Sequence, residues 1–351
     1  MVPVKKILVL PDAGPENPFQ YQMIDFLRKS GFKVEKEVSR RFFATTAAVK
    51  KHQPDVVYYD WIQSFILGKT LPITLLKCMC FMLECLYLIH IQRIPIVHTL
   101  HNIHNHAGLW LNIEKVVYTW FLRRCSRIRV YTQETKDKVI SIFGLNPERI
   151  KLVYDVPFHH YYPNEVSRTE SRQHLHIPQA SFVYIFLGMV KPYKGIEDLI
   201  AAFRKIASLN DILMLIGASD RPVYADSIKS LVADDSRIIF QNEFVAVPQV
   251  QYYFNAADAV VLPFKNIEHS SSVDLAMSFA KPIITLKTKF MHSLLQHQST
   301  LLFDEPADLA NKLQEAKNLN LADIGQINFT IADSSNYKDF ALLFTDLQSG
   351  K

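Results

Sequence analysis

Apolar runs rich in β-branched and aromatic residues alternate with amphipathic segments along almost the whole chain. The runs lie at 7–10, 56–59, 94–100 and 128–131, and again at 182–187, 212–216, 237–240, 259–262 and 282–285. Segments with helical spacing separate them, for example 18–30, 136–143, 196–207, 248–255 and 270–279. This alternation is typical of βαβ units. It predicts an α/β protein with two parallel, Rossmann-like sheets.

The alternation lapses over a polar stretch rich in His and Tyr, residues 158–180, and then restarts. We therefore predict a first domain over 1–160, a second over 161–335, and a C-terminal helix within 336–351 that packs back on the first domain. Ligands of parallel sheets bind in the loops that follow the carboxyl ends of the strands. We expect the two sheets to face a cleft and function to lie in those loops.

Composition and charge narrow the class of protein. Of 351 residues, 49% are hydrophobic and 21% charged, which indicates a globular chain. Residues 1–160 hold 22 Lys and Arg against 13 Asp and Glu, a charge of +9, whereas the rest carries −4. The basic half predicts an anionic partner, either a membrane surface or a phosphate-bearing substrate, unless the charges are merely solvated. No nucleic-acid motif accompanies them, so we expect no nucleic-acid partner.

Residues 71–94 form a strongly apolar segment. Lys77 and Glu84 interrupt it seven residues apart, so they share a helical face and leave runs too short to span a bilayer. The helix either packs inside the domain, which we favour, or lies in a membrane interface. The four cysteines lack zinc-site spacing and the chain opens directly on a strand. We expect a cytoplasmic protein, peripheral on the inner face of the cytoplasmic membrane.

The loop after the apolar run 182–187 reads Gly-Met-Val-Lys-Pro-Tyr-Lys-Gly and precedes an amphipathic helix. Gly188 permits a tight turn, and Lys191 and Lys194 stand just before the helix N-terminus. Free backbone N–H groups, the helix dipole and two cations suit a diphosphate. The spacing is not that of a Walker loop. The loop is either a phosphate site or an ordinary basic loop.

This loop resembles the donor-phosphate loop of GT-B glycosyltransferases, particularly the large retaining family numbered four. Residues 256–264 and 275–284 resemble the same family's Ala-Asp-hydrophobic-Pro strand and its next helix and strand. The resemblance implies GT-B architecture and a nucleotide-sugar donor whose diphosphate contacts Gly188, Lys191 and Lys194. It also implies stereochemical retention. We expect no cofactor and no metal.

The second half departs from the family at one turn. Typical members carry two glutamates eight residues apart, and those positions are Ile267 and Leu275 here. Acidic residues stand one step inward, at Glu268 and Asp274. The turn Ser270-Ser271-Ser272 resembles a subset of the family with a serine- and glycine-rich turn. Hydroxyl and N–H groups at a helix N-terminus can hold a phosphate or ribose, so the donor-binding set includes Glu268, Ser270, Ser271, Ser272 and Asp274, although Glu268 can equally be a solvated loop acid.

In the first half, residues 97–106 hold four histidines and resemble the family's Thr-Val-His-Asn loop. No acidic or cysteine ligand has suitable spacing, so we expect no metal. His101 is the best acid–base candidate. The resemblance implies that Asn102 and His106 face the acceptor, whereas we expect His98 and His104 to be structural.

The first loop, residues 11–20, resembles the family's Asn-Pro-Tyr-Gln opening. Gly14 and Asn17 are expected to lie close to the donor phosphates, although Asn17 also suits a helix N-cap. Asp60 and Trp61 end a strand where the family often has His-Trp.

Three functions are compatible with these features. We favour a hexosyltransferase that moves sugar to a glycan or lipid-linked acceptor in polysaccharide or glycolipid synthesis, with His101, Lys194 and Glu268 as catalytic residues. The missing glutamate pair keeps open a non-catalytic, donor-binding or partner-binding relative. A sugar-nucleotide epimerase would need carboxylates for proton abstraction, and Glu268 is the only obvious one. The sequence does not identify the base, the sugar or the acceptor.

Overall fold

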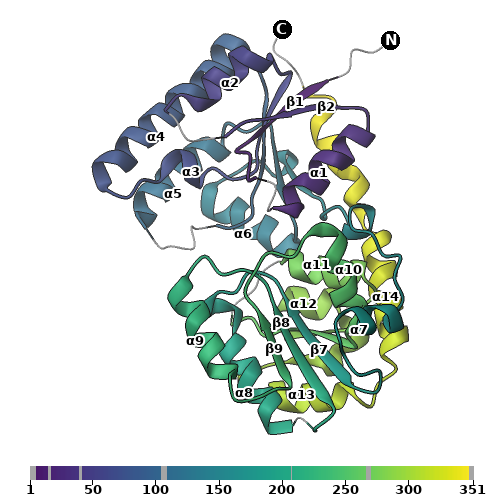
Figure 1. Cartoon of the computed structure of the whole chain (residues 1–351). Coiled ribbons are helices and arrows are strands. Elements are labelled where there is room, and N and C mark those ends of the chain that lie inside the picture. Colours follow the sequence, from purple (N-terminus) through teal and green to yellow (C-terminus); the bar gives the residue numbers. More distant parts are fainter. Residues whose placement is uncertain are drawn as a thin grey trace. The chain divides into compact units, whose positions relative to one another are not determined.

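The computed structural model describes residues 5–14, 17–38, 42–103, 109–206, 208–265 and 270–347. They form two compact units (Figure 1). The first comprises residues 1–156 together with 336–351, and the second comprises 157–335. The chain therefore passes between the units twice, at 156–157 and at 335–336, and the first passage comes four residues earlier than the sequence pattern indicated.

The first unit is built on a six-stranded parallel sheet in the order β2-β1-β3-β4-β5-β6. Its strands are β1 (Lys6–Leu10), β2 (Lys33–Lys36), β3 (Val56–Tyr59), β4 (Ile96–Thr99), β5 (Arg127–Val130) and β6 (Ile150–Leu152). Its helices are α1 (Pro18–Lys29), α2 (Ala44–His52), α3 (Gln63–Ile66), α4 (Leu71–Leu86), continued by the π-helical turn η1 (Tyr87–Gln92), then α5 (Leu111–Leu122), α6 (Gln133–Phe143), η2 (Pro147–Arg149) and η7 (Asn336–Phe344).

Both faces of this sheet are buried, because successive side chains of a strand point to opposite faces. Leu8 and Leu10 of β1 join a core with residues of α2, α4, α5 and α6, whereas Ile7 and Val9 join a core with α1. Helices α2 and α4 accordingly lie on one side of the strands and α1 on the other (Figure 1). The C-terminal segment completes the second core, since the ring of Phe344 packs edge-on 5.5 Å from that of Tyr58.

Helix α4 turns its polar side chains inward and many of its apolar side chains outward. Lys77 donates hydrogen bonds to the carbonyls of Ser64 and Leu67, and Glu84 is buried and accepts one from the Thr46 amide. The helix buries one face in the core, yet exposes leucine and methionine along the other. By length and composition, Leu71–Gln92 could cross a membrane. The segment is thus half-buried and fits neither sequence alternative by itself.

The second unit holds a parallel sheet in the order β12-β11-β10-β7-β8-β9. Its strands are β7 (Phe182–Leu187), β8 (Asp211–Ile216), β9 (Ile238–Gln241), β10 (Ala259–Leu262), β11 (Ile283–Leu286) and β12 (Leu302–Phe303). Its helices are η3 (Phe158–His160), α7 (Arg168–His174), η4 (Pro192–Lys194), α8 (Ile196–Ile206), α9 (Pro222–Val232), α10 (Val247–Ala256), α11 (Ser271–Ser278), α12 (Lys289–Leu294), η5 (Gln296–Leu301), η6 (Pro306–Asp308), α13 (Leu309–Ala316) and α14 (Leu321–Asp333).

A buried ion pair fixes the start of this sheet. Arg172 of α7 is fully buried and donates hydrogen bonds to the Asp258 carboxylate and to the carbonyls of Ala256 and Ser181. The same carboxylate accepts the Val183 amide at 2.8 Å. The pair therefore connects α7 to the segments that enter β7 and β10.

We expect Arg172→Ala to lower the free energy of unfolding by about 3–5 kcal/mol, because it removes the fully buried cation of the pair and leaves the carbonyls of Ala256 and Ser181 without their donor. Arg168 contacts the other oxygen of Asp258 at 3.1 Å, but its side chain is 49% exposed. Arg168→Ala is the matched control and should cost less than about 1 kcal/mol. Urea denaturation measures both. Equal losses for the two variants would contradict the assignment of the stability to the buried arginine.

Candidate functional site

Two loops of the second unit leave the sheet side by side, because β7 and β10 are neighbours although they are not consecutive. Ligands of parallel sheets bind at such a reversal of strand order. The loop after β7 passes directly over the loop after β10. A Cβ atom on Gly195 would lie 2.0 Å from the Pro263 carbonyl oxygen, and the Lys265 amide donates to the Tyr193 carbonyl.

The first turn of the β7 loop also meets the start of α11. Gly188 has φ +156°, and a Cβ atom there would lie 3.2 Å from the Ser272 hydroxyl oxygen. The Gly188 carbonyl also excludes a side chain at Gly217, because a Cβ atom there would lie 1.9 Å from the carbonyl oxygen. The glycines thus bring the ends of β7, β8 and the serine-rich turn together.

Lys194 is the least solvated cation of this loop. Its side chain is 9% exposed, and its Nζ atom lies 3.9 Å from the ring centroid of Phe264 and 5.3 Å from that of Tyr193. Loss of hydration, reinforced by the charge of Lys191, lowers the pKa of Lys194 to about 8. Among the residues that the structure describes, no carboxylate pairs with it. A desolvated ammonium without a counter-charge favours binding of an anion.

Lys191 is held differently. Its Nζ atom lies 3.1 Å from an oxygen of Asp220, and both side chains are substantially exposed. This contact lowers the pKa of Asp220. Lys191 must therefore leave Asp220, or share its charge, to contact a phosphate as the sequence predicts. An exposed pair of this kind contributes at most about 1 kcal/mol, so the exchange is inexpensive.

The serine-rich turn caps α11. The hydroxyl of Ser270 accepts the Ser272 amide at 3.3 Å, and Ser271 begins the helix. Asp274 lies in the first turn of α11 and is half-buried. Four of the five donor-binding residues predicted around this turn therefore lie at one helix N-terminus. The fifth, Glu268, lies outside the described residues.

The first unit gathers a second polar group, also at a reversal of strand order, where β1 lies beside β3. Asp60 follows β3 and is fully buried. One of its oxygens accepts from Gln20 Nε2 at 3.1 Å, and the other accepts from the Tyr58 hydroxyl at 3.1 Å and contacts His101 Nε2 at 2.7 Å. The ends of β3 and β4 and helix α1 therefore meet at one carboxylate.

His101, the predicted acid–base residue, is held through both ring nitrogens. Nε2 faces Asp60, Nδ1 lies 3.0 Å from the Tyr131 hydroxyl, and the ring stacks on Trp61 with centroids 4.7 Å apart. The Asp60 contact fixes the ring orientation. To exchange a proton with a substrate, His101 would first have to break its hydrogen bond with either Asp60 or Tyr131.

The structure describes two of the four residues predicted near His101. Asn102 is half-buried beside His101, and His104 and His106 lie outside the described residues. His98 is structural, since it is buried and bonded through both nitrogens, to the Tyr59 carbonyl and the Tyr118 hydroxyl. Burial lowers the pKa of His98 to about 3.

Gly14 and Asn17 shape the loop that follows β1. Asn17 caps α1, because its side chain accepts the Gln20 amide. Gly14 has φ +85°, its amide donates to Asp12 Oδ1, and a Cβ atom would meet nothing within 4 Å. The structure thus shows local roles for both residues in the first unit.

The sequence pattern indicated no role for Asp60 and Trp61, and it did not indicate Gln20 or Tyr131 as site residues. The available signal was position: Asp60 and His101 both follow a buried strand closely, as site residues of parallel sheets do. Their pairing across 41 positions depends on β3 and β4 being neighbours, which the sequence pattern did not specify.

Comparison with known proteins covers both units. The first matches the family model "Glycosyltransferase Family 4" over residues 9–155. The second matches "Glycosyl transferases group 1" over residues 181–318. The chain is 26% identical over 268 residues to a GDP-mannose:glycolipid 4-beta-D-mannosyltransferase of Xanthomonas campestris pv. campestris, which spans 76% of this chain and 69% of that protein.

Solved structures share the fold at low sequence identity. Anabaena Alr3699/HepE in complex with UDP-glucose has a TM-score of 0.72 at 18% identity, covering 96% of this chain and 98% of that one. Sucrose-phosphate synthase from Thermosynechococcus elongatus has a TM-score of 0.72 at 15% identity, covering 97% and 96%. Both sheets of the chain are thus those of the GT-B architecture.

We expect Gly195→Ala to destabilise the second unit by more than the roughly 1–2 kcal/mol of a left-handed alanine, because its Cβ would also meet the Pro263 carbonyl. Gly14→Ala is the control, since it carries the same backbone penalty without a clash. Thermal unfolding compares them. A Gly195→Ala variant as stable as Gly14→Ala would show that the two loops do not pack as closely as described.

Proposed function

Because the chain is a GT-B glycosyltransferase of the family-four type, we propose that it transfers a hexose from a nucleotide sugar to a glycolipid or lipid-linked glycan, in polysaccharide or glycolipid synthesis. The Xanthomonas relative, named for transfer from GDP-mannose to a glycolipid, supports this acceptor class. The observation that carries the donor proposal is Lys194, a desolvated cation directly before the N-terminus of α8.

We propose that catalysis is mainly electrostatic. As the sugar–phosphate bond breaks, negative charge grows on the leaving diphosphate. Lys194 and the N-terminus of α8 stabilise that charge where it develops, and Lys191 adds to it after leaving Asp220. The hydroxyl and N–H groups of Ser270–Ser272 bind the ribose or a phosphate, and the reaction uses no metal or other cofactor. Retention of stereochemistry belongs to this proposal through the family resemblance.

The residues of the first unit serve the acceptor in this proposal. His101, with Asn102 and His106, contacts the acceptor or the transferred sugar. Asp60 acts as a positioning residue through its bond to His101. The alternative, a non-catalytic relative that only binds donor, is favoured by one observation: Leu275 replaces one of the family's two glutamates and is buried. Measured transfer separates the two functions.

We expect Lys194→Ala to lower the transfer rate by about 10²–10³-fold, the usual loss when one transition-state donor is removed. Lys191→Ala should mainly weaken donor binding. Lys205→Ala, at the exposed far end of α8, is the control for helix charge. Wild-type turnover in Lys194→Ala would refute the assignment.

Affinity for a nucleoside diphosphate should also fall as pH rises above about 8 in the wild type, because Lys194 then loses its proton.

A panel of nucleotide sugars, tested by the stabilisation that each confers, identifies the donor for this assay. A donor present at a hundredfold its Kd adds about 2.7 kcal/mol to the free energy of unfolding. Stabilisation without transfer to any acceptor would favour the non-catalytic relative.

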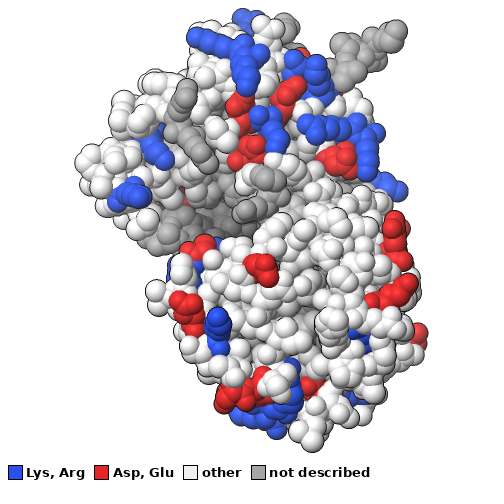
Figure 2. Space-filling model, viewed as in Figure 1, with Lys and Arg blue, Asp and Glu red and all other residues white. Residues whose placement is uncertain are grey.

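We also propose that the first unit works on the inner face of the cytoplasmic membrane. Its charge of +9 over residues 1–160 supports attraction to anionic lipid. Helix α4 supports insertion, because its outward stripe is apolar: Leu75, Leu76, Met79 and Leu83 are between 43% and 54% exposed. Lys69 before α4 and Arg93 after η1 are exposed basic residues at the two ends of this stripe. Figure 2 shows Lys and Arg side chains gathered at the upper end of the first unit as drawn.

Vesicle co-sedimentation should show binding to vesicles rich in anionic lipid, little binding to neutral ones, and loss of binding as salt rises. The double variant Leu75→Glu/Met79→Glu should lose most of this binding, since it places two charges at the apolar stripe. Leu209→Glu, at a leucine of the second unit that is 92% exposed, is the control. Equal binding to both vesicle types, or none to either, would contradict the proposal.

A further inference from the structure

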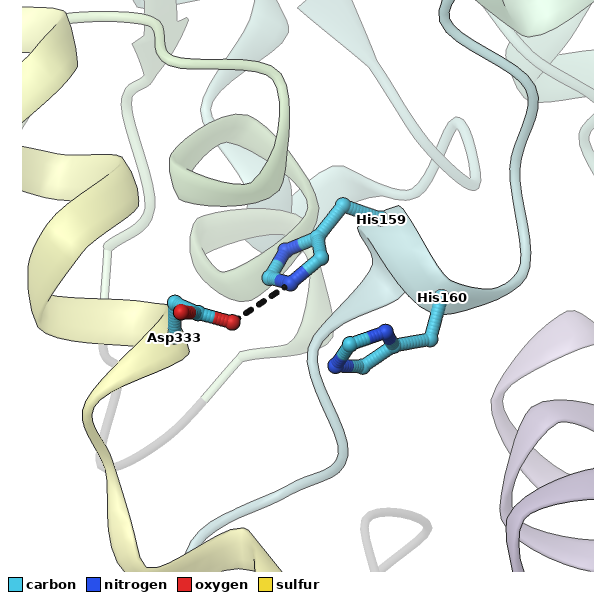
Figure 3. A group of neighbouring side chains, drawn as sticks. All are labelled: His159, His160 and Asp333. Carbon is cyan, nitrogen blue, oxygen red and sulfur yellow. Dashed lines mark hydrogen bonds and ion pairs between the residues drawn. The ribbon is translucent and has the colours of Figure 1, made fainter. Parts of the chain in front are cut away.

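Three potential metal ligands lie beside the points where the chain passes between its units. His159 and His160 belong to η3, just after the first passage at 156–157. Asp333 ends α14, just before the second passage at 335–336. Figure 3 shows the two imidazole rings and the carboxylate turned toward one another. None of these residues belongs to the loops proposed to bind donor or acceptor.

The spacing of their ligand atoms is close to that of a metal centre. His159 Nε2 lies 3.0 Å from Asp333 Oδ1, and one ligand atom from each of the three residues lies within 4.8 Å of the others. Zinc bonds of about 2.0–2.1 Å place the ligands of a tetrahedral site roughly 3.3 Å apart. Because His160 and Asp333 are exposed, side-chain rotation alone can close the remaining distance.

The half-buried member of the group, His159, is already oriented. The His159 ring lies 4.6 Å from that of Phe329, which is four residues before Asp333 and therefore on the same face of α14. Its backbone is fixed by the preceding residue, whose amide donates to the buried Ser278 hydroxyl at 2.8 Å. The helix thus supplies one ligand, Asp333, and also holds the ring of a second.

We propose that His159, His160 and Asp333 bind a divalent transition-metal ion of the zinc type, with water completing its coordination. Two imidazoles and one carboxylate suit Zn²⁺, Co²⁺ or Ni²⁺, whereas Mg²⁺ and Ca²⁺ prefer oxygen ligands. The bound ion links the segment that enters the second unit to the helix that leads out of it. Its role is structural, and it is separate from the metal-independent transfer chemistry proposed above.

The affinity of this site is expected to be moderate. Metal-bound histidines usually donate their second ring nitrogen to an acceptor, which strengthens the site. His159 Nδ1 is buried and has no hydrogen-bond partner within the part of the chain that the structure covers. We therefore expect the ion to bind about 10–100-fold more weakly than at a site whose histidines are all held in this way.

Calorimetric titration of the tag-free protein with Zn²⁺, and with Co²⁺ followed by its visible absorption, tests the proposal. We expect one saturable site in the wild type. His160→Ala and Asp333→Asn should each weaken it at least about tenfold, since even the loss of an outer hydrogen-bond partner costs 10–100-fold. His174→Ala, at an exposed histidine of α7 in the same unit, should leave the affinity unchanged.

Both ligand variants change exposed side chains, so thermal unfolding without metal should match the wild type and exclude misfolding. The wild type alone should gain stability on addition of Zn²⁺. The proposal is overturned if the wild type shows no saturable binding up to millimolar Zn²⁺. It is also overturned if His160→Ala and Asp333→Asn bind the ion as tightly as the wild type.

Discussion

Parallel strand pairing is the constraint on which both candidate sites depend. Every loop that follows a strand emerges at the same edge of its sheet, and two such loops become neighbours where the strand order reverses. In the second unit this places Gly188 and Gly195, after β7, against Ser272 and Pro263, after β10. In the first it brings Asp60 within reach of Gln20. The chemistry of each site is therefore set by backbone topology first and by side-chain identity second.

The sequence predicted much of this framework for a physical reason. A strand buried on both faces must be apolar throughout, so the runs at 182–187 and 259–262 were visible and correspond closely to β7 and β10. The basic loop after β7 was visible because glycine and lysine stand directly after such a run. The contact of Asp60 with His101 was not, because it depends on which strands pair, and the contact of Lys191 with Asp220 depends on the path of two loops.

Helix α4 shows a further limit of sequence patterns. Periodicity reveals that Lys77 and Glu84 share a face, but not which face the protein covers. The structure buries the polar face, where Lys77 caps backbone carbonyls of the preceding segment and Glu84 receives an amide. Burial raises the pKa of Glu84 and lowers that of Lys77, so both charged forms are disfavoured there. A helix on the surface of a water-soluble protein ordinarily turns its polar face outward and its apolar face inward. The apolar stripe that α4 leaves exposed therefore favours contact with an apolar environment over contact with water.

The departure at Leu275 bears directly on how a donor can be held. The family resemblance assigns this position to a glutamate, yet Leu275 is 8% exposed and cannot bind a ribose. The first turn of the same helix offers the hydroxyls of Ser270–Ser272 instead, beside the Gly188 turn. Hydroxyl and amide donors at a helix N-terminus interact with phosphate as well as with ribose. In the transferase that we propose, this replacement would remove a carboxylate that binds hydroxyl groups but repels phosphate, and would leave donor groups that can also stabilise the leaving diphosphate. More of the proposed catalysis would then rest on Lys194 and the helix N-termini.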